Sequence, residues 1–191
     1  MKKGLNITLS VISKITEILH WIAAAVSVLL LGIHAVDKSF FPEVIAEEGG
    51  AEFASYGLEV CALTPNGEFN GYAITLFCIS AFITCSLMAL VFRNLNIILR
   101  TISGRNKKAE STSPFQIDIE RRVREIGIFA IAIPVASIFL SIVFTTISTL
   151  NGLALETVTS LDGVVIGLVC LCLSHVFNYG TKLEEEVDGL L

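Results

Sequence analysis

Four long stretches with almost no charge constrain the fold of this chain more than any other feature. They cover residues 18–36, 71–92, 126–150 and 161–179, and Asp162 is their single formally charged residue. A helix needs about 20 consecutive apolar residues to cross the hydrocarbon core of a bilayer. The pattern therefore predicts four transmembrane helices and argues against a soluble globular enzyme.

The spacing of these stretches leaves little chain for a separate soluble domain. The chain has 191 residues, so the rest forms an outer loop at 37–70, an inner loop at 93–125 and a polar tail at 180–191. We expect an all-α fold, a single membrane domain built as a bundle of four transmembrane helices. Strand character at 56–63 and a Thr-Pro-Asn-Gly turn signal at 64–67 predict a small β-hairpin in the outer loop.

Helices two and three are expected to continue beyond the membrane as a hairpin within the inner loop. Ser113 and Pro114 form a typical helix start, because Ser can cap backbone N–H groups and Pro suits the first turn. Apolar residues recur at helical spacing on both sides of the loop, at Phe92, Leu95, Leu99 and Ile102, then at Phe115, Ile119, Val123 and Ile126. The two extensions are therefore predicted to be amphipathic.

The basic residues are sorted to one side of the predicted membrane. Of the 13 Lys and Arg residues, only Lys38 falls in the loop at 37–70, whose other charged residues are all acidic. Loops rich in Lys and Arg stay on the cytoplasmic side of a membrane. The sorting predicts a multi-pass protein with both the N- and C-termini in the cytoplasm.

A basic cluster in the inner loop is the main candidate binding site. Its members are Arg100, Arg105, Lys107, Lys108, Arg121, Arg122 and Arg124. Basic residues beside a bilayer attract anionic lipid head groups, by about 1 kcal/mol each. The cluster predicts contact with such head groups or with a membrane or cytoplasmic protein partner, unless it serves only to fix the topology. Aromatic residues do not interleave with it, so we expect no nucleic-acid binding.

Small residues and hydroxyl groups mark two further features of the spans. Gly163 and Gly167 are four apart, a spacing that allows two helices to approach closely, so we expect them to contribute to helix packing. A small transporter or channel subunit is the alternative to a binding protein. It predicts a water-accessible cavity lined by five hydroxyl side chains, those of Ser80, Thr84, Ser137, Ser141 and Thr145.

The residue types that usually carry chemistry do not converge in this sequence. The five cysteines include no CxxC pair, and four of them lie inside the apolar stretches. His20 and His34 lie on one predicted helix, about 21 Å apart along its axis, too far to share a metal. We therefore expect no catalytic residue, no metal and no cofactor.

The second half of the chain resembles a known family. The shared pattern is Ser113-Pro114-Phe115, then Arg121-Arg122-x-Arg124-x-Ile126-Gly127, then Phe177-x-x-Gly180-x-x-Leu183-x-x-Glu186-x-Asp188-x-Leu190. Over roughly residues 72–191 it is similar to the small bacterial membrane proteins catalogued as domain of unknown function 2975. The resemblance implies four spans in a bacterial plasma membrane and no assigned activity. Relatives often stand beside a gene for a small helix-turn-helix regulator, which implies at most a regulatory or stress-linked setting.

These observations together favour a non-enzymatic role. We expect an accessory or regulatory membrane protein whose basic inner hairpin touches lipid or a partner. The transporter or channel subunit described above is the second hypothesis. An intramembrane enzyme ranks third, because no acid, base and nucleophile occur at one depth of the spans.

Overall fold

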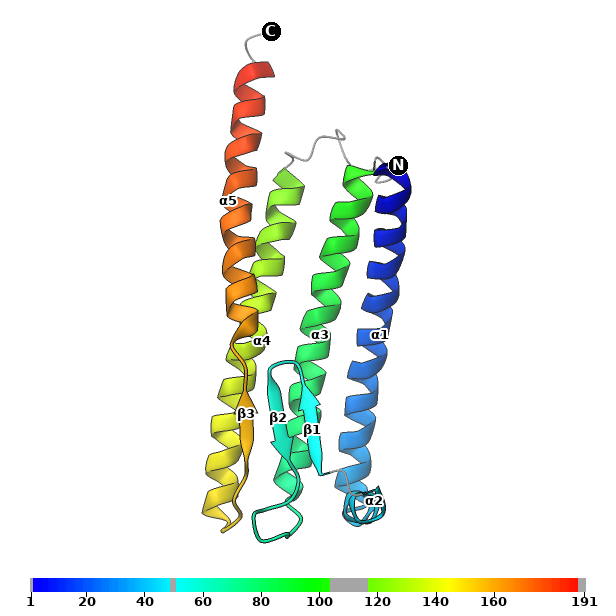
Figure 1. The fold of residues 1–191 in the computed structure, drawn as a ribbon, viewed down its shortest axis with the longest axis vertical. Coiled ribbons are helices and arrows are strands. Elements are labelled where there is room, and N and C mark those ends of the chain that lie inside the picture. The colour runs from blue at the N-terminus through cyan, green and yellow to red at the C-terminus, as the bar shows by residue number, and fades with distance from the viewer. Residues whose placement is uncertain (1, 49–50, 104–116, 189–191) are drawn as a thin grey trace. The chain divides into compact units, whose positions relative to one another are not determined.

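The computed structural model describes residues 2–48, 51–103 and 117–188. The chain is mostly helical, with three short strands. In chain order the elements are α1 (Lys2–Val36), α2 (Phe40–Glu48), β1 (Glu52–Ser55), β2 (Leu58–Cys61), α3 (Gly71–Ile102), α4 (Ile117–Leu150), β3 (Thr157–Thr159) and α5 (Asp162–Asp188) (Figure 1).

Four helices are long and apolar enough to cross a membrane, in agreement with the sequence. Their apolar segments are Asn6–Val36, Gly71–Ile102, Asp118–Leu150 and Asp162–Leu183. The first segment is longer than the predicted 18–36, because apolar residues continue at helical spacing toward the N-terminus of α1.

The helical extensions differ in detail from the expected ones. α3 continues to Ile102, as the apolar stripe predicts. α4 begins at Ile117, and the predicted helix start at Ser113 and Pro114 lies outside the described residues. α5 continues to Asp188, so the polar tail is helical up to that residue.

Contacts between Cα atoms divide the chain into two units, and each is described by itself. Unit 1 comprises Met1–Leu19, Leu87–Ile131 and Val164–Leu191, whereas unit 2 comprises His20–Ser86 and Ala132–Gly163. The four long helices therefore each contribute residues to both units.

Unit 2 contains an antiparallel sheet whose first two strands form the expected hairpin. β1 pairs with β2 so that Ser55 lies opposite Leu58, which places Tyr56 and Gly57 in the turn. Gly57 has a φ of 74°, a conformation that side chains disfavour and glycine adopts freely. The predicted turn at 64–67 forms as well. The N–H of Gly67 donates to the carbonyl of Thr64 at 2.8 Å, and Leu63 and Phe69 pair in an antiparallel bridge across the turn. The β1–β2 hairpin lies before it, with its own turn at Tyr56 and Gly57.

β3 makes the fold depart from the all-α prediction. It follows α4 and completes a sheet of order β1-β2-β3, with Val158 opposite Glu59. Three residues are too few for an alternating pattern to reveal a strand in the sequence. The strand forms because β2 offers its second edge to the β-branched residues Thr157, Val158 and Thr159.

The apolar core of unit 2 lies between the sheet, α2 and α3. α2 falls in the segment predicted as a loop, and it forms there because Phe41 and Ile45, one turn apart, reach this core. The other fully buried members include Leu58 and Val60 of β2 and Ile74 of α3. The segment predicted as the outer loop, residues 37–70, therefore contributes to the hydrophobic core.

Unit 1 buries several polar side chains beside a few apolar ones such as Ile119. On α1, Ser13 and Glu17 are buried, whereas Ile12, Ile15 and Ile18 are 54%, 53% and 49% exposed. A helix at the surface of a soluble protein turns its apolar face inward. The N-terminal half of α1 does the reverse, which is the arrangement expected in an apolar medium.

Candidate functional site

The main candidate site is the charged end of unit 1, defined as residues 93–102 of α3 and 118–125 of α4. Asp118 and Glu120 lie in the first turn of α4, and Arg100 lies in the last turn of α3. Acidic residues at a helix N-terminus and basic residues at a helix C-terminus both interact favourably with the helix dipole. The sequence therefore favours helix ends at this place.

The three arginines of α4 are paired with carboxylates on the same helix. Arg121 Nε lies 3.0 Å from Glu125 Oε1, and Arg122 Nη1 lies 3.2 Å from Glu125 Oε2. Arg124 Nη1 lies 3.4 Å from Glu120 Oε1, one turn back. Each carboxylate reduces the charge that its arginines present to other molecules.

Asn94 connects these charges to α3. Its Nδ2 donates to Glu125 Oε2 at 3.0 Å, and Arg122 Nη1 donates to its Oδ1 at 3.0 Å. Asn94 is only 4% exposed, so both partners are needed to satisfy its buried amide. The cluster therefore fixes α3 and α4 against each other.

The N-terminal half of α1 joins the same end through hydroxyl groups. Ser10 Oγ donates to Asn96 Oδ1 at 3.1 Å, and Ser13 Oγ donates to the carbonyl of Phe92 at 2.8 Å. Three helices of unit 1 are thus linked by hydrogen bonds that an apolar surrounding would not weaken.

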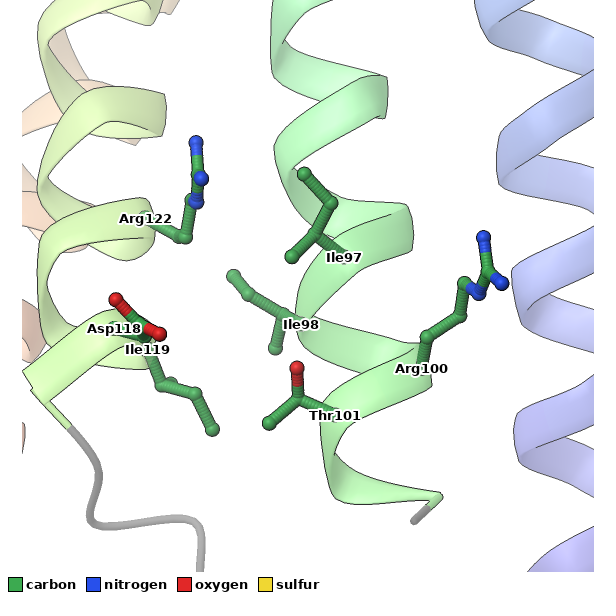
Figure 2. A pocket seen from close by; sticks show the side chains of 7 residues that line it. All are labelled: Ile97, Ile98, Arg100, Thr101, Asp118, Ile119 and Arg122. Carbon is green, nitrogen blue, oxygen red and sulfur yellow. The ribbon is translucent and has the colours of Figure 1, made fainter. Parts of the chain in front are cut away.

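A pocket of about 290 Å³ lies between α3 and α4 at the charged end. Its lining comes from about one turn of each helix: Ile97, Ile98, Arg100 and Thr101 of α3, and Asp118, Ile119 and Arg122 of α4. Figure 2 shows Asp118 and Arg122 beside this space, whereas Arg100 points away from it toward α1. The pocket therefore presents the Asp118 carboxylate, the Arg122 guanidinium and the Thr101 hydroxyl, and three isoleucines form the apolar part of its lining.

The structure brings together only part of the predicted basic cluster. Arg122 lines the pocket and shares Glu125 with Arg121, whereas Arg100 borders the pocket but its side chain points away toward α1. Arg105, Lys107 and Lys108 lie outside the described residues. The i, i+4 spacing of Glu120 and Arg124 predicts their ion pair, and the structure confirms it. The engagement of Arg121 and Arg122 by Glu125 and Asn94 was not predicted.

Glycine brings α4 and α5 close together within unit 1. A Cβ atom at Gly127 would lie 2.9 Å from the carbonyl oxygen of Gly167, and one at Gly167 would collide with Ile131. The predicted Gly167 therefore faces Gly127, a partner that the sequence pattern did not suggest. Gly163 is half-buried in the first turn of α5.

The hydroxyl groups expected to line a transport cavity contact the sheet of unit 2 instead. Ser55 and Thr84 hydroxyls lie 2.9 Å apart, and Ser141 and Thr157 hydroxyls lie 2.6 Å apart. Ser137 Oγ donates to the carbonyl of Tyr56 at 3.4 Å. Of the five predicted residues only Thr145 is not buried. The sheet thus occupies the interior beside these polar side chains.

Metal binding finds no support in the described parts of the chain. Within residues 2–48, 51–103 and 117–188, no group of three or more His, Cys, Asp and Glu side chains is arranged to hold a metal ion. All five cysteines are free thiols.

Comparison with known proteins gives no relative for this chain. No protein-family model, curated protein or solved structure matches it. The resemblance to domain of unknown function 2975 therefore stays a prediction.

Proposed function

We propose that this chain is a non-enzymatic accessory or regulatory protein of a bacterial plasma membrane, with both termini in the cytoplasm. Its charged end would bind a protein partner on the cytoplasmic side. Four helices apolar enough to span a bilayer support the membrane placement, and the sorting of Lys and Arg supports the orientation.

The observation that most supports the proposal is the network of ion pairs and hydrogen bonds within the charged end. Glu120, Glu125 and Asn94 already engage the three arginines of α4. Paired arginines attract anionic lipid head groups less than free ones do. The pairing instead fixes a surface of mixed charge around a pocket, and electrostatic complementarity of this kind suits recognition of another protein.

The transporter or channel alternative receives less support. It needs a water-filled path among the five hydroxyl side chains, and three of these bond to the sheet of unit 2. Ser80 Oγ has no hydrogen-bond partner among the described residues but is fully buried, so these hydroxyl groups do not line an open path.

Site-specific photocrosslinking in native membranes tests the proposal. A photoreactive amino acid replaces Asp118, which is exposed and lines the pocket, and a control probe replaces the exposed Glu68. We expect one discrete protein adduct from position 118 and none of that mass from position 68. The adduct should disappear in Asn94→Leu, which releases Arg122 and Glu125 from α3.

Two results would contradict this role. Adducts with lipid alone at position 118 would show that the charged end only meets head groups. A protein adduct that persists in Asn94→Leu would show that the bonded arrangement of α3 and α4 is irrelevant to it.

A further inference from the structure

A groove between α1 and α3 in unit 2 is the strongest unassigned feature. Its volume is about 570 Å³, within the usual range of small-molecule sites. One face of α1 between residues 23 and 30 forms one wall, and Phe77, Ala81 and Cys85 of α3 form the other. Residues 54–56 of the hairpin close it. The small side chains of Ala23 and Ala81 leave the space between the walls.

Two histidine contacts hold α1 beyond either end of this wall. His20 Nε2 lies 2.6 Å from the Tyr56 hydroxyl, and the two rings stack at 5.5 Å. Fourteen residues further along, the ring of His34 packs edge-on against Phe41 and Phe69. The segment between the contacts is about 21 Å long. Because contacts at His20 and His34 fix α1 on both sides of the groove, the space between them is a defined feature of the fold and does not come from loose packing of α1.

The hydroxyl groups along the groove are already hydrogen-bonded inside the protein. Ser27 Oγ donates to the carbonyl of Ala23 at 2.9 Å, and Ser55 bonds to Thr84. The hydroxyl of Tyr56 is engaged by His20. An occupant therefore meets carbon atoms and satisfied side-chain hydroxyls, which favours an apolar ligand over a polar one.

The surface around the groove is also apolar. Val26, which lines the groove on α1, is 45% exposed within a helix that is a candidate membrane span. In the proposed membrane placement this open side of the groove faces lipid. The medium that surrounds its mouth consists of acyl chains.

We propose that this groove is a binding site for one acyl chain of a membrane lipid. The chain would lie along residues 23–30 of α1 and fill the space that Ala23 and Ala81 leave open. The proposal rests on the membrane placement argued above, but it does not depend on a partner at the charged end of unit 1.

Photolabelling from the lipid phase tests the site. The full chain is reconstituted in nanodiscs of phosphatidylethanolamine and phosphatidylglycerol that contain a trace of phospholipid with a diazirine in one acyl chain. Mass spectrometry then locates the adducts. We expect enrichment on residues 77–85 relative to the other exposed apolar faces. Ala23→Phe fills the groove and should reduce that labelling several-fold, and Ala81→Phe does the same from the opposite wall.

Two variants separate filling from general disturbance. Ser27→Ala lies on the same wall but adds no volume, and Val135→Phe adds volume to an exposed site on α4. Both should leave the groove labelling unchanged. Equal labelling of all exposed faces, or labelling of residues 77–85 that persists in both filling variants, would overturn the proposal. Rapid reaction of Cys85 with a charged thiol reagent, in a variant that retains only this cysteine, would also overturn it by showing water in the groove.

The same experiment distinguishes failure of the membrane placement. In that case no segment would take up the lipid label. If only the groove proposal fails, the exposed apolar residues of α1 and α5 still carry adducts.

Discussion

The two units of this chain differ in their apolar cores, although both bury polar side chains. Unit 2 buries Leu58, Val60 and Ile74 beneath a small sheet, as a soluble domain would. Unit 1 buries Asn94, Asn96 and Glu17 beside a few apolar residues, and it exposes isoleucines of α1. Burial of apolar area stabilises a fold only when water is the alternative. Unit 1 therefore depends mainly on directed hydrogen bonds between helices, whereas unit 2 depends both on hydrogen bonds and on packing of its own core.

The comparison implies that the two units are sensitive to different substitutions. Removing methyl groups should lower the free energy of unfolding most in unit 2. Removing a polar group should be most costly in the interior of unit 1.

Leu58→Ala should cause the largest loss of stability. Leu58 is 1% exposed, and a buried Leu→Ala change costs about 2–5 kcal/mol through lost transfer energy and the cavity left behind. Val158→Ala, at a residue 65% exposed on the neighbouring strand, is the matched control and should change little. The free energy of unfolding in detergent micelles measures both. Equal losses in the two variants would show that the sheet does not shield a core.

Gly127→Val should destabilise the packing of α4 on α5 in unit 1. Added atoms must displace the carbonyl of Gly167 and the side chain of Leu171, and overpacking of this kind costs about 1–3 kcal/mol. Gly32→Ala is the control, because nothing lies within 4 Å of a Cβ there. It should stabilise α1 slightly through helix propensity. A neutral result for Gly127→Val, measured by the same unfolding assay, would contradict the close approach of the two helices.

Asn94→Leu should cost about 1–3 kcal/mol, because it leaves Arg122 and Glu125 without their shared amide. Asn96→Leu removes a single hydrogen bond from Ser10 and should cost about 0.5–1.5 kcal/mol. Thermal unfolding of both variants gives the order. The reverse order would mean that the link from α1 to α3 matters more than the link from α3 to α4.

Ser39→Ala should have the smallest effect, at the exposed surface of unit 2. Hydrogen bonds from the hydroxyl and the backbone N–H of Ser39 hold the pKa of Asp37 below its usual value. A lowered pKa favours the folded state above the unfolded pKa of about 4, and the benefit is lost as pH falls. Removing the hydroxyl should raise the pKa of Asp37 and flatten this dependence. An NMR titration of Asp37 that is unchanged in the variant would contradict the assignment.

The sequence predicts the long helices far better than the contacts between them. Charge-free stretches locate α3, α4 and α5 because a helix long and apolar enough to cross a bilayer needs about 20 apolar residues in a row. The apolar segment of α1 begins earlier than the predicted span at 18–36. Lys14 and Glu17 interrupt the apolar run in the sequence, and they pair with each other on one side of α1. Counting charges along the sequence does not reveal that Lys14 and Glu17 both lie on the polar face of the helix.

The sheet and the candidate site could be predicted only in part. The turn at 64–67 was predicted and forms, whereas the β1–β2 turn at Gly57 was not predicted. β3 depends on pairing with β2 and has no local signature of its own. In the charged end, the arginines stand out by composition, but their engagement by Asn94 depends on how α3 and α4 pack. Such tertiary contacts between distant residues are invisible to periodicity.

The most direct test of the account concerns the N-terminal half of α1, where polar residues point inward and isoleucines outward. Spin labels at Ile12, Ile15 and Ile18, and at Ser13 and Thr16 for comparison, are placed one at a time in protein reconstituted into bilayers. The collision rates with oxygen and with a water-soluble nickel chelate are then measured. We expect labels at the isoleucine positions, like a label at Leu29, to collide more often with oxygen than with the nickel chelate, because lipid surrounds them. Preferential access of the nickel chelate to all three isoleucine positions would contradict it.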